Sequence, residues 1–271
     1  MDLSVEPFPA QEARAPGDAA EAVFVRKLAW MGPLTAADRA ALEQVCARSR
    51  RYGPHAELLR QGEVPDSAIV VLQGFAGRYR HRSSGACQIL AHLLPGDLCD
   101  PNLAYPRAMD HTVGTLSSCT VARIPRESYL TLVEQHPAVA RALDLARLVD
   151  EAVAREWLVS IGRRSARERL AHLFCELHAR LARVGLTSGY AFDLHLTQVG
   201  LSDTTALTSV HVNRTLRDMR REDLIELKGR RFVIRDPERL RAIAEFDGAY
   251  LRPAEIPPSR PPGDGAANAG A

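Results

Sequence analysis

The chain has 271 residues, of which 46% are hydrophobic, and its formal net charge at pH 7 is +2. This apolar content is sufficient for one or two hydrophobic cores, and the length is typical of two domains. The charge excludes a uniformly polycationic protein, so any nucleic-acid site must depend on a local concentration of basic residues.

The sequence contains neither a candidate membrane span nor a candidate disulfide framework. The longest aliphatic run, residues 68–72, is far too short to cross a bilayer, and residues 1–6 lack the basic and apolar regions of a signal peptide. The five cysteines are widely spaced and form no Cys-x-x-Cys pair: Cys46, Cys87, Cys99, Cys119 and Cys175. We therefore expect a cytoplasmic protein without disulfides or a bound metal.

Segments with different patterns follow one another along the chain. Residues 1–22 are rich in proline, alanine and acid and predict a disordered arm, and the proline- and glycine-rich residues 251–271 predict a disordered tail. Residues 23–136 begin with a short helix, which Thr35 caps, and continue as short β-type runs separated by glycine. No long helices alternate with these runs, so the pattern predicts a compact β unit rather than a parallel α/β sheet.

A long helix is predicted over residues 137–162, and it is apolar on two faces. Such a helix must bury both faces, which we expect to lie against its own domain and against a second copy of the chain. The candidate dimer interface follows a heptad-like seam along one face: Leu145, Val149, Ala152, Glu156 and Val159. The alternative is a core helix that is buried entirely within one chain.

Residues 163–250 contain the pattern of a helix-turn-helix. Thr197 can cap a short helix, and Thr208 can cap a second helix that runs from Ser209 to about Arg221. Two short helices joined by a tight turn form the helix-turn-helix plan, in which the second helix recognises DNA.

The second of these helices presents a polar face that suits DNA. Val212, Leu216 and Met219 recur at helical spacing and form its inward face. On the opposite face, Arg214 can form two hydrogen bonds with guanine, and Asn213 can pair with adenine or with a phosphate. The N-terminal part of such a helix is the part that enters the major groove.

A hairpin with a basic tip follows the second helix. Two apolar runs flank residues 228–231, and the cationic tip suits contact with phosphates. Residues 209–235 hold eight basic and four acidic residues, a local net charge of +4. The alternative is an amphipathic helix with a solvent-exposed arginine face beside a hairpin, without a role in DNA binding. It would explain each element by itself, but not the order of cap, turn, helix and basic hairpin along the chain. The candidate DNA-binding residues are Thr197, Gln198, Thr208, Ser209, Val210, His211, Asn213, Arg214, Arg217, Lys228, Arg230 and Arg231.

The segments SVHVNRTL (209–216), EDLI (222–225) and DPERL (236–240) closely resemble those of Crp/Fnr-type transcription regulators. The resemblance extends over about residues 25–250. It implies an α+β chain with an N-terminal β-roll of the cyclic-nucleotide-binding jelly-roll type, a long dimerisation helix and a C-terminal winged helix-turn-helix. It further implies an effector-sensing β-roll, a homodimer, double-stranded operator DNA as ligand and contact with RNA polymerase, without enzymatic activity.

The sensor residues depart from those of the best-known members of that family. Cyclic-AMP binders carry an arginine pair that neutralises the cyclic phosphate, whereas Asp110 and His111 stand at that place here. An acid there repels a phosphate, so we expect no cyclic AMP in the usual mode. No cysteine precedes Cys46, so we expect no iron–sulfur centre of the oxygen-sensing kind, and no cofactor is identified. The candidate residues for an unknown small-molecule or redox effector are Asp97, Cys99, Asp110 and His111.

Two other functions are weighed against a DNA-binding regulator. A β-roll sensor would act on a protein partner beside a vestigial winged helix, but the intact Asn213-Arg214 pair argues against this. An enzyme would use the cluster around Cys99 and His111, but no nucleophile motif, phosphate loop or HExxH motif supports it.

In the turn of the helix-turn-helix, Ala206 replaces the usual glycine, which costs about 1 kcal/mol if φ is positive there.

Overall fold

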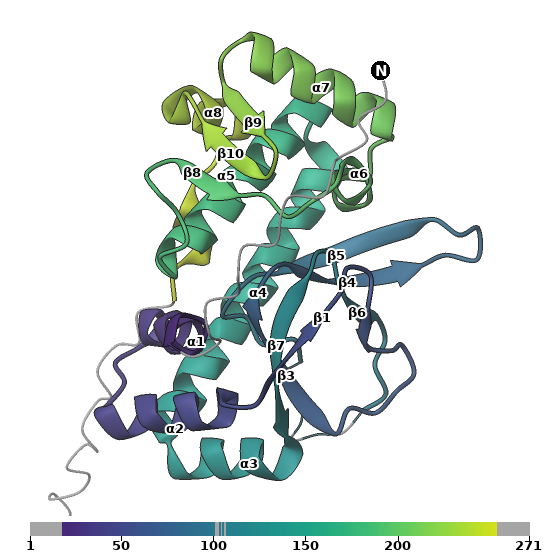
Figure 1. Ribbon diagram of the computed structural model, residues 1–271. Helices are drawn as coiled ribbons and strands as arrows, with labels where there is room; N and C mark the ends of the chain where they lie inside the picture. The colour runs from purple at the N-terminus through teal and green to yellow at the C-terminus, as the bar shows by residue number, and fades with distance from the viewer. Residues whose placement is uncertain (1–17, 101–102, 104, 106, 254–271) are drawn as a thin grey trace, which may run out of the picture.

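The computed structural model describes residues 18–100, 103, 105 and 107–253 (Figure 1). The elements of the N-terminal part are α1 (Asp18–Met31), α2 (Ala36–Cys46), β1 (Ser49–Tyr52), β2 (Glu57–Leu59), β3 (Ser67–Gln73), β4 (Ala76–His81), β5 (Cys87–Leu93), β6 (Thr112–Thr115), β7 (Cys119–Pro125) and α3 (Arg126–Gln135). The long helix α4 (Pro137–Arg163) leads to a C-terminal part. Its elements are α5 (Ala166–Arg183), β8 (Ala191–Asp193), α6 (Gln198–Thr205), α7 (Ser209–Arg221), β9 (Ile225–Lys228), β10 (Arg231–Ile234), α8 (Pro237–Ala244) and the 3-10 helix η2 (Gly248–Leu251).

The N-terminal strands form two antiparallel sheets, with the orders β1-β7-β3 and β2-β6-β4-β5. Strand β3 is an unbroken apolar run because both of its faces are covered. Ile69 and Val71 belong to the core between the sheets, whereas Val70 and Leu72 belong to the core that the helices complete. Successive side chains of a strand alternate between its faces, which accounts for this division. The predicted β-roll is therefore confirmed.

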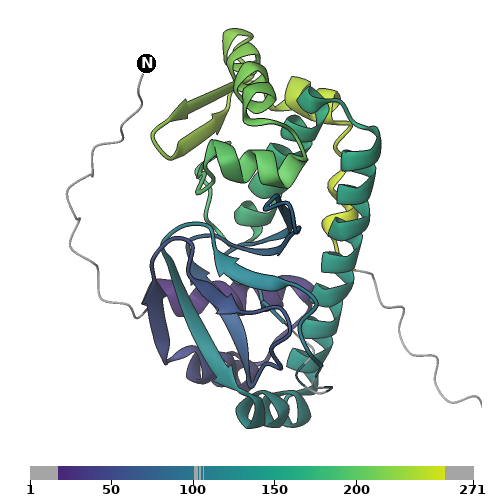
Figure 2. The same ribbon diagram turned by 90° about the vertical axis from the view of Figure 1, so that its right-hand side faces the viewer.

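Helix α4 runs beside the β-roll and continues into the C-terminal part (Figure 2). Pro137 stands in its first turn, where the missing N–H has no partner to lose. One face of the helix is buried within the chain: Val139, Ala142, Leu143, Leu145, Val149, Val153, Trp157 and Ser160. Among the described residues, no helix is both long enough and apolar enough to cross a bilayer.

The winged helix-turn-helix is confirmed, with a third strand that the sequence did not suggest. Strand β8 pairs with β10, which in turn pairs with β9. The ring of Phe232 on β10 lies 5.2 Å from that of Phe192 on β8 and 4.3 Å from that of Phe174 on α5. Strand β8 escaped prediction because three residues are too few to show an alternating pattern.

The boundary predicted for the N-terminal arm is wrong in part. Helix α1 begins at Asp18, inside the predicted arm of residues 1–22. Phe24 and Leu28 are almost fully buried and anchor this helix in the main hydrophobic core. Residues 1–17, the rest of the predicted arm, lie outside the described residues.

The boundary predicted for the C-terminal tail is also too early. Leu251 is fully buried at the end of η2, in the same core as the residues of α5. The tail predicted over residues 251–271 therefore starts inside an ordered element, and residues 254–271 lie outside the described residues.

A buried cluster of charges joins the N-terminal and C-terminal parts. The Asp97 carboxylate, in the turn after β5, lies 2.7 Å from Lys27 Nζ on α1 and 2.7 Å from Arg180 Nη2 on α5. Arg180 also contacts Glu176 at 3.2 Å and donates a hydrogen bond to the His92 carbonyl at 2.9 Å. Asp97, Glu176 and Arg180 are all buried. A single carboxylate therefore holds two helices of different domains to the β-roll.

The neighbours of this cluster complete its hydrogen bonds. Glu176 accepts hydrogen bonds from Trp157 Nε1 at 3.1 Å and from the Tyr250 hydroxyl at 3.0 Å. At Gly96, which has a φ of +94°, a Cβ atom would lie 2.9 Å from Lys27 Cβ. Glycine is thus required for α1 to approach the turn that carries Asp97.

We predict that Asp97→Asn lowers the free energy of unfolding by about 3 kcal/mol, because it leaves the buried Arg180 and the largely buried Lys27 without their shared counter-charge. Urea unfolding at fixed protein concentration measures this loss. Glu57→Gln, which removes one carboxylate of the exposed Arg60–Glu57 pair, should cost less than about 1 kcal/mol. Equal losses for the two variants would contradict the prediction.

The same variant should change how the free energy of unfolding depends on pH in acidic solution. Burial alone would raise the Asp97 pKa, but Lys27 and Arg180 together lower it from 3.8 to about 2. A carboxyl whose pKa is lower in the folded state stabilises the protein above its unfolded value, and this stabilisation is lost as pH falls from about 4 to about 2. In urea unfolding at several pH values, the free energy of unfolding of Asp97→Asn should therefore change less between about pH 4 and about pH 2 than that of the unaltered protein.

Candidate nucleic-acid interface

Helix α6 begins and ends as its sequence predicts. The Thr197 hydroxyl accepts a hydrogen bond from the Gly200 backbone N–H at 3.0 Å, which satisfies a donor that the first turn leaves free. Ala206 ends the helix in the left-handed region, with a φ of +54°. An alanine in this conformation costs about 1 kcal/mol, which the surrounding helix packing must offset.

Helix α7 has one buried face and one face open to a partner. The Thr208 hydroxyl caps the helix by accepting a hydrogen bond from the His211 N–H at 3.3 Å. Val212, Leu216 and Met219 are buried, as their spacing predicts. All twelve predicted DNA-binding residues are exposed, and those on α7 are Ser209, Val210, His211, Asn213, Arg214 and Arg217.

The arginines of α7 differ in what they contact. Among the described residues, none of the ion pairs involves Arg214 or Arg217. Arg220, one turn further along, donates to the Leu216 carbonyl at 3.2 Å. Arg221, at the end of the helix, is also exposed and forms no ion pair among the described residues, but Arg214 and Arg217 are the arginines with available donors nearest the N-terminal half of α7.

An ion-pair cluster that sequence reasoning missed holds the end of α7 in place. Glu222 accepts two hydrogen bonds from Arg167 on α5, at 2.6 and 2.7 Å, and one from Arg239 on α8 at 2.7 Å. The two-pronged geometry restrains the direction of α7 relative to α5. No local pattern indicates these contacts, since Arg167 and Glu222 are 55 residues apart.

The β9–β10 hairpin forms the wing and lies at the same end of the molecule as α7 (Figure 1). Gly229, with a φ of +59°, makes its turn. Lys228 is exposed but pairs with Glu226 at 2.6 Å, and Arg231 stands opposite Asp193 in the register of β10 and β8. Arg230 at the tip is exposed, so it is the wing residue best placed for a phosphate.

Helix α6 also contacts the β-roll. Thr204 on α6 forms a hydrogen bond with His92 Nε2 at 3.0 Å, and its carbonyl accepts one from Gln88 at 3.3 Å. Burial lowers the pKa of His92 to about 3, so its ring is neutral at pH 7. A groove of about 950 Å³ separates the rest of α6 from the β2-β6-β4-β5 sheet, with Thr197 and Tyr79 among its lining residues. The helix-turn-helix and the β-roll are therefore in direct contact.

The structure does not assemble the predicted effector residues into one site. The Asp97 carboxylate is occupied by Lys27 and Arg180 in the buried charge cluster. Cys99 is buried in the core between the sheets, and burial raises its pKa to about 12. A protonated, inaccessible thiol is a poor redox sensor, so the roles expected of these two residues are not supported.

Asp110 and His111 form a pair apart from Asp97. The His111 Nδ1 atom lies 2.6 Å from an oxygen of Asp110, whose side chain is largely exposed. The His111 Nε2 atom is buried without a hydrogen-bond partner among the described residues. Of the four candidates, this pair alone keeps a polar group available for a ligand.

The seam predicted for the dimer interface is turned largely into its own chain. Leu145 and Val149 belong to the main core, and Glu156 pairs with Arg164 and His172 of the same chain. Of the predicted seam, Val159 is exposed, and the other large apolar side chains that α4 exposes are Leu148 and Leu158. A heptad pattern cannot tell which of two apolar faces points inward, because both repeat with the same spacing.

Both parts of the chain match known protein families. The family described as the cyclic nucleotide-binding domain matches residues 49–136, which span most of the β-roll. The family described as the Crp-like helix-turn-helix domain matches residues 168–243, from α5 to α8.

Characterised relatives match both parts at once. The transcriptional activatory protein AadR of Rhodopseudomonas palustris is 30% identical over 221 residues, which cover 81% of this chain and 90% of the relative. The chain belongs to the Crp/Fnr family of transcription regulators. The transcriptional activator protein FnrL of Cereibacter sphaeroides is 31% identical over 199 residues, which cover 72% of this chain and 79% of the relative.

Solved structures agree on the fold of this Crp/Fnr protein. FixK2 from Bradyrhizobium japonicum superimposes with a TM-score of 0.64 at 23% identity, over 77% of this chain and 98% of the other. The relatives are DNA-binding transcription regulators and not enzymes, so the regulator prediction is confirmed over the enzyme alternative.

We predict different losses for an arginine on the helix and one on the wing. Arg214→Ala should cost about 1–3 kcal/mol of binding to a specific site and relax the preference for one guanine in each half-site. Arg230→Ala should weaken all sequences alike and reduce the salt dependence, because it removes a phosphate contact.

Fluorescence anisotropy on a specific and a scrambled duplex, at several salt concentrations, measures both effects. Arg60→Ala, which removes an exposed β-roll arginine, serves as the control and should change neither. If both variants lost the same affinity for both duplexes, the assignment of base and phosphate roles would be wrong.

Proposed function

We propose that the protein is a homodimeric regulator that reads an inverted-repeat operator in double-stranded DNA in response to a signal. The observation that carries the proposal is the exposed face of α7, where Arg214 and Arg217 have no ion-pair partner among the described residues, beside a basic wing. A rigid, capped helix that presents free guanidinium groups suits major-groove recognition. A gel-shift with DNA from upstream of candidate target genes tests it.

Roles follow from where the side chains lie on α7. Arg214 would form two hydrogen bonds with guanine, and Asn213 would pair with adenine or with a phosphate. Val210, which is 77% exposed one turn before Arg214, lies on the same face. It would contact a thymine methyl group rather than accept a hydrogen bond. Arg230 would meet the backbone at the wing.

Dimerisation would use the face of α4 that the chain leaves open. Leu148, Ala152, Arg155 and Val159 are spaced by four, three and four residues, as a coiled-coil seam requires. Leu148 and Val159 are half-exposed, and the opposite face of the helix is already buried. A second copy packed on this seam would place two α7 helices on half-sites about 34–36 Å apart.

The signal would differ from that of the best-known relatives. Asp110 stands where a cyclic phosphate needs a cation, so cyclic AMP would not bind in the usual mode. Family membership supports RNA polymerase as the partner at promoters.

Val210 provides a test of the operator sequence. We expect selection from a random duplex library to recover a guanine opposite Arg214 and, at the neighbouring pair, thymine or no strong preference. Val210→Glu should gain a preference for a C·G pair there, because a carboxylate accepts a hydrogen bond from cytosine N4. Recovery of a fully specified cytosine by the unaltered protein would rule out this role for Val210.

The dimer seam is tested by adding a charge to it. Leu148→Glu places two carboxylates close to the two-fold axis, and we expect it to weaken the dimer at least tenfold in sedimentation velocity. Val64→Glu makes the same change at another exposed apolar residue, away from α4, and should leave the dimer intact. An unaltered dimer in Leu148→Glu would show that the seam lies elsewhere.

A further inference from the structure

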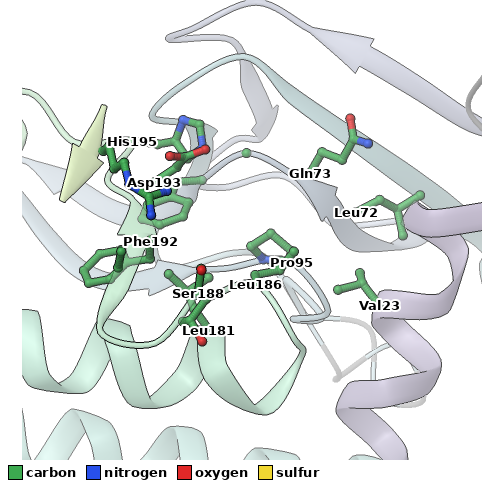
Figure 3. A pocket seen from close by; sticks show the side chains of 15 residues that line it. Val23, Leu72, Gln73, Pro95, Leu181, Leu186, Ser188, Phe192, Asp193 and His195 are labelled. Carbon is green, nitrogen blue, oxygen red and sulfur yellow. The ribbon is translucent and has the colours of Figure 1, made fainter. Parts of the chain in front are cut away.

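A cavity of about 370 Å³ lies between the β-roll and the winged-helix part, and no role described above uses it (Figure 3). Its walls come from α1, from the β3–β4 turn, from Pro95, and from the segment between α5 and β8. We propose that this cavity binds a small, neutral aromatic molecule that carries one hydrogen-bond donor on its ring, with His195 as the acceptor.

The inner wall of the cavity is apolar and preformed. Val23, Leu72, Phe75, Leu181 and Phe192 are each no more than 3% exposed. Figure 3 shows Phe192 and His195 on one side and Leu72 and Val23 on the opposite side. A volume near the lower end of the range for ligand pockets fits a molecule of one or two rings.

His195 supplies a polar atom that the protein itself leaves unsatisfied. Its Nδ1 atom is buried and has no hydrogen-bond partner among the described residues. Its ring packs edge-on against Phe75, with 5.1 Å between the ring centroids. Burial lowers the pKa of His195, so the ring is neutral near pH 7. In the tautomer protonated at Nε2, the Nδ1 atom is an unsatisfied acceptor, and a rotation of the His195 ring, which lines the cavity, would bring it to a ligand there.

The charges at the rim select a neutral ligand. Asp193 and Arg231 both line the cavity and stand opposite each other in the register of β8 and β10. Their opposite charges leave the rim close to neutral, which favours neither an anion nor a cation. An aromatic ring suits walls that contain Phe75 and Phe192.

Occupancy of this cavity would affect both domains. Val23 and Phe75 belong to the sensor side, whereas Leu181 and Phe192 belong to the winged-helix side. A molecule that touches both sides stabilises the arrangement in which the two surfaces are close, as any ligand favours the state it binds. An effect on operator affinity rests on the proposed function, but the binding itself does not.

Calorimetry on the full chain tests the site with indole as the probe and 1-methylindole, which has no N–H donor, as its control. We expect indole to bind about tenfold more tightly than 1-methylindole. His195→Phe keeps the ring against Phe75 but removes the acceptor, so it should abolish that difference without loss of the folded state in circular dichroism. Leu186→Trp, which fills the half-exposed mouth, should weaken both molecules.

The matched control is His81→Phe, at an exposed histidine on β4, which should leave both affinities unchanged. No binding of indole, equal binding of the two molecules, or a preference that survives His195→Phe would overturn the proposed site. In a separate operator titration, indole should change the apparent affinity of the unaltered protein. Binding of indole without such a change would overturn the link to DNA, and an absence of operator binding both with and without indole would overturn the proposed function instead.

Discussion

The Asp97 carboxylate lies buried between Lys27 of α1 and Arg180 of α5, and the relative placement of the two domains depends on it. Removing three charges from water is costly, and their attraction offsets that cost only when the geometry is good. The cluster therefore acts less as a source of stability than as a geometric constraint. Any displacement of α5 from the β-roll leaves a buried charge without its partner.

Helix α5 connects the Asp97 cluster to α7, the second helix of the helix-turn-helix. Arg180 near one end of α5 contacts Asp97 of the β-roll, and Arg167 near the other end holds Glu222 at the end of α7. The two arginines are thirteen residues apart in one helix, which corresponds to about 20 Å. A helix held at both ends links the position of α7 to that of the β-roll. The contact between His92 and Thr204 joins the β-roll to α6 as a second connection.

Helix α4 has one face buried within its own chain and another that the chain leaves open. Its inner face, with Leu145, Val149 and Trp157, belongs to the core of its own chain. Its outer face keeps Leu148 and Val159 half-exposed, which is a cost that a second copy would remove. The cavity at His195 is of a similar kind, because the fold leaves there a buried polar atom unsatisfied.

The sequence by itself determined the elements whose causes are local. The caps at Thr197 and Thr208 and the left-handed Ala206 depend on residues within one or two turns, so they could be predicted. The inward face of α7 follows from helical periodicity, and the order of strands and helices from glycine and apolar runs.

Only the tertiary structure decided which groups are neighbours across the chain. The two cations of Asp97 come from positions 70 and 83 residues away, so a residue that seemed free for an effector is an internal counter-charge. The same holds for the faces of α4, for strand β8 and for the cavity at His195. Periodicity shows that a face is buried, but the element that covers it is selected by packing between distant segments.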